Sequence, residues 1–292
     1  MRVLVTGGAG FVGTNLIKRL LSDGHEVTSL DNYSTGFESN HIDGCEYIRV
    51  DLSDSSHKHE AWNQEKFRLG SYDIIYHLAA IARIQPSLKK PTITLHNNFN
   101  STLNILEWAR ENKTKVVFSG SSSKHHGLWG SPYAWSKYSC EQLCELYHKV
   151  FNLEVSICRF YNVYGEYQIQ DGEFSTLMGI FMRQYEQGED LTITGDGTQR
   201  RDFTHVDDIV DALIKVGNEY FSDLEIFELG RGKNFSVNEI AEMFNHTTKY
   251  IPARKGEYPT TLCDYSHAQD LLDWTPTRNI EDFIQEFVNN RI

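Results

Sequence analysis

The chain has 292 residues, of which 40% are hydrophobic and 23% are charged, with six prolines. This length and composition describe a folded globular protein of one large or two ordinary domains. They exclude a small domain stabilised by disulfide bonds and a disordered chain. The formal net charge of −12 repels polyphosphates unless cations are gathered locally, so we expect nucleic acid not to be a partner.

Hydropathy and cysteine content argue against a membrane protein and against an oxidising compartment. The longest apolar run, residues 74–82, is interrupted by His77 and is far shorter than the roughly 20 residues of a membrane helix. Residues 2–6 form a strand-like start that lacks the features of a signal peptide. The five cysteines are odd in number and form no CxxC pair, which favours reduced, buried thiols. We therefore expect a cytoplasmic protein.

Short β-branched segments alternate with helix-length amphipathic segments through the first half of the chain. This alternation predicts a parallel sheet with helices on both faces, that is, an α/β fold with a doubly wound sheet. Six strands are expected, at residues 3–6, 26–30, 47–50, 74–77, 115–119 and 155–159. Apolar residues recur three and four positions apart in the expected helices at residues 11–23, 92–112 and 133–151.

After residue 159 the pattern changes to shorter elements separated by glycines. Helices are expected at residues 236–245, 266–272 and 280–290. We assign residues 1–162 to the sheet domain and residues 163–292 mainly to a smaller mixed domain that would bind substrate. Residues from about 203 to 230 are expected to return and pack on the first domain.

Gly7, Gly10 and Gly13 lie between the first expected strand and the first expected helix. A tight turn there needs unusual backbone angles, a close approach to a pyrophosphate leaves no room for a Cβ, and the helix N-terminus supplies free N–H groups. Asp31 ends the second strand, 18 residues after Gly13, where a carboxylate accepts hydrogen bonds from ribose hydroxyls and repels a 2′-phosphate. The first domain is thus predicted to be a Rossmann-type domain that binds NAD rather than NADP.

With these residues the sequence resembles the extended short-chain dehydrogenase/reductase superfamily, and within it the NAD-dependent nucleotide-sugar epimerases of the UDP-glucose 4-epimerase type. The GxxGxxG spacing of the glycines is the superfamily's form, and the likeness runs from Arg2 to about Asn290. The resemblance implies contacts with the ribose from residues 31–36, with adenine from residues 51–52, and with the phosphates and ribose from residues that follow the fourth strand. The cofactor-binding residues that it implies are Gly7, Gly10, Phe11, Val12, Gly13, Asp31, Asn32, Ser34, Thr35, Gly36, Asp51, Leu52, Leu78, Ala79, Ala80, Asn98, Ser119, Tyr133, Lys137 and Phe160.

Tyr133 and Lys137 are four residues apart in an expected helix and therefore lie on one face of it. A tyrosine with its usual pKa of about 10 is a poor base at neutral pH. A neighbouring ammonium group and the positive nicotinamide ring both favour the phenolate, so we expect a lowered pKa for Tyr133 and a role in general acid–base catalysis. The pair resembles the catalytic YxxxK pair of the superfamily.

The resemblance also implies a hydroxyl residue at the end of the fifth strand, where residues 119–123 offer four serines. Counting forward from the strand selects Ser121, whereas counting back from Gly127 selects Ser122; we expect Ser121 to be catalytic and Ser122 to lie beside the substrate. The family usually has a tyrosine before this glycine, but here His125 and His126 precede it. No third ligand lies at metal-binding spacing from the two histidines, so we expect solvated loop residues and no metal site.

The same segment distinguishes the reactions of the superfamily. Its dehydratases carry an Asp-Glu pair after the hydroxyl residue, and its decarboxylases generally keep a Glu there, whereas no acid occurs between Ser119 and Gly130 of this chain. What remains is removal and return of a hydride at C4 of a sugar, with Tyr133 taking the hydroxyl proton. The 4-keto intermediate would turn over within the pocket before the hydride returns to its opposite face.

Three segments of the second half resemble family segments that hold a nucleotide diphosphate. The resemblance assigns the diphosphate to Asn162, Arg201 and Arg254, because a guanidinium matches the geometry of phosphate oxygens. It assigns the ribose to Glu257, and it places Thr261 where the family's gate residue is small in enzymes that also accept N-acetylhexosamines. The implied substrate-binding residues are Ser121, Ser122, Tyr133, Asn162, Arg201, Arg254, Glu257 and Thr261.

The function that the resemblance favours is that of a UDP-glucose/UDP-galactose 4-epimerase with NAD as cofactor. The alternatives are a UDP-N-acetylhexosamine 4-epimerase, another C4-oxidising reductase or dehydratase with an unrecognised acid, and a catalytically silent NAD-binding regulator. The expected helices at residues 92–112 and 133–151 resemble those that pair across a two-fold axis in this family, so a homodimer is expected.

Overall fold

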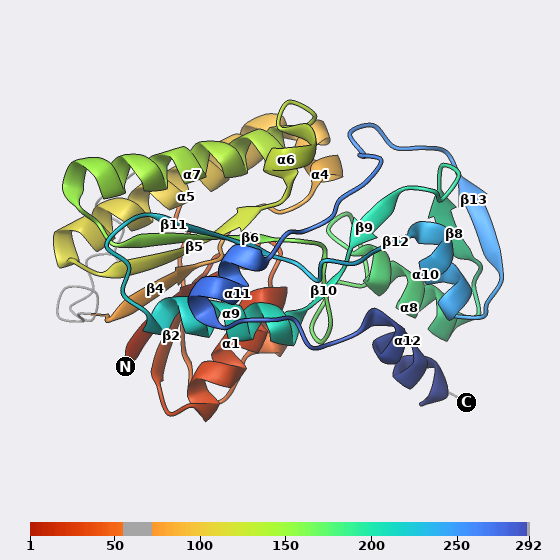
Figure 1. The fold of residues 1–292 in the computed structure, drawn as a ribbon, viewed down its shortest axis with the longest axis horizontal. Coiled ribbons are helices and arrows are strands. Elements are labelled where there is room, and N and C mark those ends of the chain that lie inside the picture. Colours follow the sequence, from red (N-terminus) through yellow and green to blue (C-terminus); the bar gives the residue numbers. More distant parts are fainter. Residues whose placement is uncertain (55–71, 291–292) are drawn as a thin grey trace.

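The computed structural model describes residues 1–54 and 72–290. Within these ranges a seven-stranded, entirely parallel sheet forms the centre, in the order β11-β6-β5-β4-β1-β2-β3 (Figure 1). The predicted α/β class and doubly wound sheet are confirmed, whereas the seventh strand was not expected. The strands are β1 (Arg2–Thr6), β2 (Glu26–Asp31), β3 (Glu46–Arg49), β4 (Ile74–His77), β5 (Lys115–Ser121), β6 (Val155–Phe160) and β11 (Glu225–Leu229).

Helices cover both faces of this sheet, so its central strands β4 and β5 are buried along their whole length. One face carries α5 (Pro91–Asn112) and α7 (Pro132–Phe151), and the other carries α1 (Phe11–Ser22), α9 (Val206–Asn218) and α11 (Ser266–Leu272) (Figure 1). Side chains alternate along a strand, so Val3 and Val5 join the core under α1 and α9, whereas Leu4 joins the core under α5 and α7. None of the helices in the described part of the chain combines the length and hydropathy that a membrane span needs.

A second, smaller unit lies beyond the carboxyl ends of the strands (Figure 1). Its core is built around buried aromatic residues, among them Phe181 and Phe244. Between its strands the chain returns through α9 and β11, and β11 pairs with the edge strand β6 of the large sheet. The unit contains the strand pairs β7 (Val163–Tyr164) with β10 (Thr204–His205), β8 (Leu191–Thr194) with β13 (Thr248–Ile251) and β9 (Arg200–Asp202) with β12 (Asn234–Ser236), and the helices α8 (Leu177–Gln187), α10 (Val237–Met243) and α12 (Ile280–Asn289).

The end of β5 and the start of α7 set the positions of Ser121 and Tyr133. Strand β5 runs to Ser121, two residues further than expected, so Ser119 and Ser121 lie on the same face of the strand. Helix α7 begins at Pro132, and the side chain of Ser131 caps it by accepting a hydrogen bond of 3.1 Å from the backbone N–H of Ala134. This cap fixes Tyr133 in the first turn of α7.

Strand order reverses at β1, which pairs with β2 on one side and β4 on the other. The loops that follow β1 and β4 therefore diverge, and in such sheets they leave a crevice at the carboxyl ends of the strands. Two short helices border this crevice: α4 (Ile84–Lys89), which follows β4, and α6 (Ser123–Gly127), which follows β5.

Candidate active site

A cavity of about 910 Å³ extends from the loop after β1, past the start of α7, to the loops of the second unit. Every predicted site residue lines it except Gly36. Gly36 instead packs against the glycine loop, where an added Cβ would lie 2.8 Å from the carbonyl carbon of Ala9. The structure therefore brings together in one cavity Gly7, Gly10, Phe11, Val12, Gly13, Asp31, Asn32, Ser34, Thr35, Asp51, Leu52, Leu78, Ala79, Ala80, Asn98, Ser119, Ser121, Ser122, Tyr133, Lys137, Phe160, Asn162, Arg201, Arg254, Glu257 and Thr261.

Backbone atoms form the wall of the cavity after β1. Gly7 has a φ of +73°, and a Cβ there would lie 2.9 Å from the backbone of Ala79. A Cβ on Gly13 would lie 2.2 Å from the carbonyl oxygen of Gly7. Helix α1 begins after Gly10 with no side chain capping it, so its first N–H groups have no side-chain partner at the positive end of the helix dipole. This arrangement fits a diphosphate.

The carboxylate of Asp31 is held in place at the end of β2. Its Oδ2 accepts a hydrogen bond of 2.9 Å from the N–H of Ala9, and its Oδ1 accepts one of 2.8 Å from the N–H of Tyr33. Each carboxylate oxygen has a second lone pair, which remains available to a ribose hydroxyl. The negative charge is thus fixed where a 2′-phosphate would be repelled, and the residues present fit NAD.

The wall after β4 is supported from behind by Asn98 of α5. Its Oδ1 accepts a hydrogen bond of 2.8 Å from the N–H of Ile81, and its Nδ2 donates to the carbonyl of Ile81 at 3.2 Å and to Ser136 Oγ at 2.9 Å. Asn98 lines the cavity as predicted, but its amide is engaged in holding this loop. Its contribution to a ligand site is therefore the position of the loop.

His77, at the end of β4, is buried and neutral. Its Nδ1 lies 2.7 Å from Thr6 Oγ1 and its Nε2 lies 3.1 Å from Thr102 Oγ1. Burial, with a smaller effect from the positive charge of Lys137, lowers the pKa of His77 to about 3. The imidazole therefore ties β4 to β1 and α5 without bringing a charge to the cavity.

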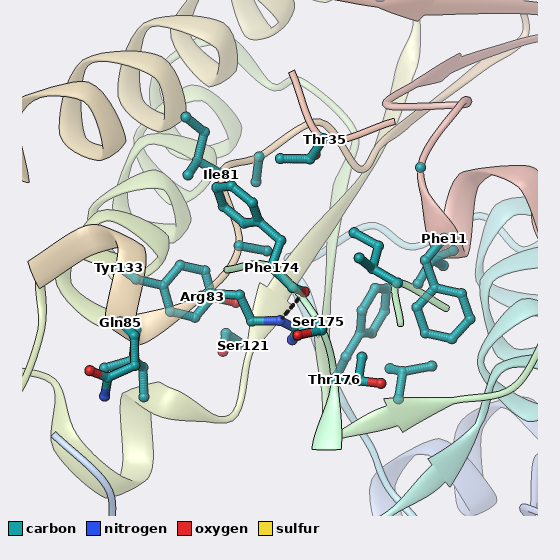
Figure 2. Close-up of a pocket in the computed structure, with 18 of the residues that line it drawn as sticks. Phe11, Thr35, Ile81, Arg83, Gln85, Ser121, Tyr133, Phe174, Ser175 and Thr176 are labelled. Atoms are coloured by element: carbon teal, nitrogen blue, oxygen red, sulfur yellow. Dashed lines mark hydrogen bonds between the residues drawn. The ribbon is translucent and has the colours of Figure 1, made fainter. Parts of the chain in front are cut away.

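Tyr133 and Ser121 lie side by side at the middle of the cavity, as Figure 2 shows, and Lys137 lines the same cavity. Ser121 Oγ accepts hydrogen bonds from the N–H of Ser123 at 3.2 Å and from Ser123 Oγ at 2.9 Å. Both donors point at the lone pairs of Ser121 Oγ, so its own proton is free to act on the neighbouring phenol, and Ser121 lowers the pKa of Tyr133. This position distinguishes Ser121, the serine expected to be catalytic, from Ser122.

The expected lowering of the Tyr133 pKa is wrong for the protein by itself. Burial raises the pKa of Tyr133, and the hydrogen bond from Ser121 and the positive charge of Arg83 oppose this rise without overcoming it. Lys137 is engaged elsewhere: its Nζ donates to Ser119 Oγ at 3.2 Å and lies 4.6 Å from the centre of the Phe118 ring. Burial also lowers the pKa of Lys137.

Arg83 is a cavity residue that the sequence analysis missed. It lies in the loop between β4 and α4, and its Nε donates a hydrogen bond of 2.9 Å to the carbonyl of Phe174, as the dashed line in Figure 2 shows. The recognised motif ends at Ala80, three residues earlier. The one available signal was an arginine among the mainly apolar residues 78–84.

The predicted substrate residues of the second unit differ in how they are held. Asn162 and Thr261 are tied into the second unit: Asn162 Nδ2 donates to the carbonyl of Asp202 at 3.0 Å, and Thr261 Oγ1 accepts from the N–H of Asp202 at 3.2 Å. Arg201 lies 6.0 Å above the Tyr258 ring, and although burial lowers its pKa, the guanidinium remains charged. Arg254 and Glu257 are exposed at the rim of the cavity.

Comparison with known proteins assigns this site to a family. Residues 3–230 match the NAD dependent epimerase/dehydratase family. The chain belongs to that family.

Relatives of this epimerase/dehydratase share its whole length. A UDP-N-acetyl-α-D-glucosaminuronate decarboxylase of Bacillus cytotoxicus is 30% identical, with 98% of this chain and 96% of that protein covered. The crystal structure of a UDP-glucose 4-epimerase from Thermotoga maritima with UDP-glucose is 28% identical and has a TM-score of 0.90 over 99% of this chain and 98% of that one. A UDP-glucuronic acid 4-epimerase from Bacillus cereus, with UDP-glucuronic acid and NAD, is 27% identical and has a TM-score of 0.86 over 100% of both chains.

The cofactor prediction is confirmed by this membership, because the protein is an NAD-dependent enzyme of the epimerase/dehydratase family. The residues that would hold NAD are those of the first half of the cavity: the backbone of the glycine loop at the diphosphate and Asp31 at the ribose. Relatives within the family carry out epimerisation and decarboxylation, so the reaction of this member follows from its own residues.

His125 is exposed, as expected, but it lies in α6 rather than in a loop. Its Nε2 is 2.7 Å from Glu228 Oε1. Arg159 reaches the same carboxylate at 2.7 Å and also pairs with Glu141, so His125 joins a network behind the cavity. The side chain of His126 lies outside the part that the structure describes.

Proposed function

We propose that the protein is an NAD-dependent 4-epimerase of a UDP-activated hexose or hexuronate, for which the sequence alone leads to UDP-glucose and UDP-galactose as the expected pair. The observation that carries this proposal is the composition of one cavity. It holds the NAD cradle, Tyr133 with Ser121 beside it, and Arg201, while residues 119–130 contain no acid that could protonate or deprotonate another carbon of the sugar. Oxidation and reduction at C4 are the chemistry that remains.

The residues at the centre of the cavity manage the proton of the C4 hydroxyl. NAD, when bound, supplies the hydride acceptor and donor at C4, and its positive ring favours the phenolate. Tyr133 takes the hydroxyl proton and returns it after the sugar has turned. Ser121 directs its own proton to the phenol oxygen and so stabilises the phenolate. Lys137 is held by Ser119 one turn further along α7, and the positive charge that acts on the phenol is that of Arg83.

Substrate turning needs one end of the substrate held and the other end loose. Arg201 and Arg254 approach the cavity from the second unit, away from Tyr133 on α7, and are suited to the diphosphate. Binding energy from this remote part of the substrate keeps the nucleotide in place while the hexose rotates. The cavity therefore supports return of the hydride to either face of C4.

Chromatography of reaction mixtures tests the proposal. Purified protein incubated separately with UDP-glucose, UDP-galactose, UDP-N-acetylglucosamine and UDP-glucuronate is expected to convert at least one of them into its C4 epimer, with no net consumption of NADH. Absence of interconversion for all of them would refute the proposal. Net oxidation of added NADH would assign a reductase instead, and a stable keto product would assign a dehydratase.

The expected homodimer rests on the outer face of α5 and α7. Ile93, Trp135, Leu146 and Val150 are exposed there, and Phe99 and Leu143 line a shallow groove between the two helices. Apolar groups gathered on one face are suited to association with a second copy. Light scattering at micromolar concentration is expected to give twice the mass of the chain, and a monomer mass would contradict the homodimer.

A further inference from the structure

Arg83 brings a positive charge to the catalytic centre of the cavity, and no acidic side chain in the described part of the chain pairs with it. Its Nε is bound to the carbonyl of Phe174, and its electrostatic partner among the described residues is the phenol of Tyr133. Figure 2 shows the Arg83 side chain entering the cavity beside Tyr133 and Ser121. Burial lowers the pKa of Arg83, but a guanidinium stays protonated in proteins. Arg83 is half-buried and lines the cavity, so its charge is partly shielded from water and is available to an anionic group of a ligand.

The other described arginines of the cavity have different positions. Arg201 and Arg254 belong to the second unit, where they suit the diphosphate, and Arg183 is paired with Asp171. Arg83 differs from them because it lies in the loop after β4, on the side of Tyr133. The cavity thus separates the cations for the diphosphate from a cation beside the reacting hydroxyl.

The loop that carries Arg83 is held from both sides. Asn98 fixes Ile81 through two hydrogen bonds, and Gln85 Nε2 donates to the carbonyl of Lys255 at 2.8 Å. Together with the Arg83 bond to Phe174, these contacts connect the loop to α5 and to two loops of the second unit. The guanidinium is therefore positioned before substrate binds, which lowers the entropic cost of using it as a binding group.

The position of Arg83 limits where on the sugar an anionic group would be. This step rests on the proposed function, in which Tyr133 and Ser121 hold the C4 hydroxyl. An anion within reach of Arg83 then belongs to a carbon next to C4, namely C3 or C5. On C5 of a hexose the substituent is C6, which is a carboxylate in a uronic acid, and the planar fork of a guanidinium matches a carboxylate. We propose that Arg83 binds the C6 carboxylate and that UDP-hexuronic acids are the substrate class of this enzyme.

Arg83 then also protects the oxidised substrate. A uronic acid oxidised at C4 is a β-keto acid: the electron pair of its C5–C6 bond can move toward the C4 carbonyl, giving an enolate, while C6 leaves as CO₂ and C5 later gains a proton. An ion pair with Arg83 stabilises the carboxylate but not neutral CO₂, so it opposes this loss. Residues 119–130 contain no acid to deliver the proton to C5. The carboxylate is retained, and return of the hydride yields the C4 epimer.

Substrate preference and the Arg83→Met variant test this inference. Wild-type protein is expected to show a kcat/KM for UDP-glucuronate about 100-fold above that for UDP-glucose, the scale of a hydrogen-bonded charge pair. Arg83→Met is expected to bring the ratio of the two kcat/KM values close to one and to raise the fraction of UDP-pentose and CO₂ among the products. Arg83→Lys, which keeps the charge, restores part of the preference. Arg19→Met, which removes an exposed ion pair with Asp23 on α1, leaves the ratio unchanged.

Three results would overturn the inference: a preference of wild-type protein for UDP-glucose, a UDP-sugar with its carboxylate on a C3 ether as the better substrate, or an equal loss for both substrates in Arg83→Met. Such a loss would show a merely structural role. Failure of the proposed function looks different, because then no UDP-hexose is interconverted. Calorimetry decides that case: at least tenfold tighter binding of UDP-glucuronate than of UDP-glucose, lost in Arg83→Met, would uphold the role of Arg83, and equal binding would reject it.

Discussion

At the cofactor end of the cavity a ligand meets backbone and one fixed carboxylate, whereas at the substrate end it meets long side chains on loops. The glycine loop and the start of α1 derive their shape from the exclusion of Cβ atoms at Gly7 and Gly13. The substrate end instead depends on Arg201 and on the exposed Arg254. A substitution in the glycine loop shifts the backbone and so alters the whole cofactor end. A substitution at the substrate end replaces one side chain and leaves the others in place.

This difference explains how one fold accommodates different UDP-sugars. Similar proteins are described with UDP-glucose, UDP-glucuronic acid or a UDP-linked glucosaminuronate, and they share the fold of this chain. A cradle made of backbone keeps NAD in one place, and a side chain such as Arg83 can then select the sugar without disturbing it. Substitutions at the cofactor end, at the substrate end and at Tyr133, which lies between them, can test this separation.

Tyr133→Phe is expected to give the largest effect. It removes the hydroxyl that exchanges the proton with C4 but keeps the ring in the first turn of α7, so kcat should fall about 1000-fold, within the usual range for a general acid–base group. NAD released from denatured protein, measured by absorbance, should remain at the wild-type level because the cradle is untouched. Unchanged turnover would show that the site is not catalytic in the manner proposed.

Gly13→Ala is expected to weaken NAD binding about 100-fold, the equivalent of roughly 2.7 kcal/mol. The new Cβ would lie 2.2 Å from the carbonyl oxygen of Gly7 and 2.7 Å from Gly8 Cα, so the loop would have to move. Gly10→Ala is the matched comparison, because its Cβ would lie 3.2 Å from the same oxygen and should have a smaller effect. Fluorescence titration with NAD measures both, and equal affinities in the two variants would contradict a cradle defined by close backbone contacts.

Protonation of His77, which lies at the cofactor end, is expected to lower the free energy of unfolding at acidic pH. Its pKa is about 3 in the folded protein and about 6.5 when unfolded, so the unfolded state binds more protons below pH 6.5 and stability falls as the pH decreases. Between pH 7 and pH 5 this group alone should remove about 2 kcal/mol from the free energy of unfolding. Urea denaturation of wild type and His77→Gln at both pH values isolates this contribution, and parallel losses in the two proteins would disprove it.

Arg201→Met is expected to have the smallest effect, about a tenfold increase in KM for the UDP-sugar, as one charged hydrogen-bonding group is lost from the diphosphate. NAD binding should not change, since the two ends of the cavity are built independently. Steady-state kinetics together with the NAD titration measure both quantities. A parallel loss of NAD affinity would show that the substrate end supports the cofactor end.

The cofactor end was predictable because its determinants are contiguous in the sequence. The glycines, the strand before them and the helix after them lie within residues 2–22, and Asp31 closes the next strand. Tyr133 and Lys137 were predictable for the same reason, since both lie on α7. Gly36 is the exception: it follows the ribose loop in sequence, but its close neighbour is Ala9 and not the cavity.

The features that escaped prediction depend on residues far apart in the chain. Arg83 is placed by the carbonyl of Phe174, which lies 91 positions away. The pKa of Tyr133 rises because of burial by several segments, which helix spacing does not reveal. Strand β11 has glutamates at positions 225 and 228, one of which pairs with Arg159, and its partner strand β6 lies about 70 residues earlier in the chain, so its place in the sheet depends on a distant contact.

The return of the chain through α9 and β11 has a consequence for how this protein can be divided. The sheet is complete only when β11 has paired with β6, yet the segments that build the second unit lie both before α9 and after β11. A fragment ending before α9 would leave the edge of β6 unpaired and the apolar surface of α1 uncovered, a combination that promotes aggregation. Neither half is thus a unit that could be expressed, swapped or fused by a single cut, and hybrids between relatives would require exchange of at least two separate stretches of the gene.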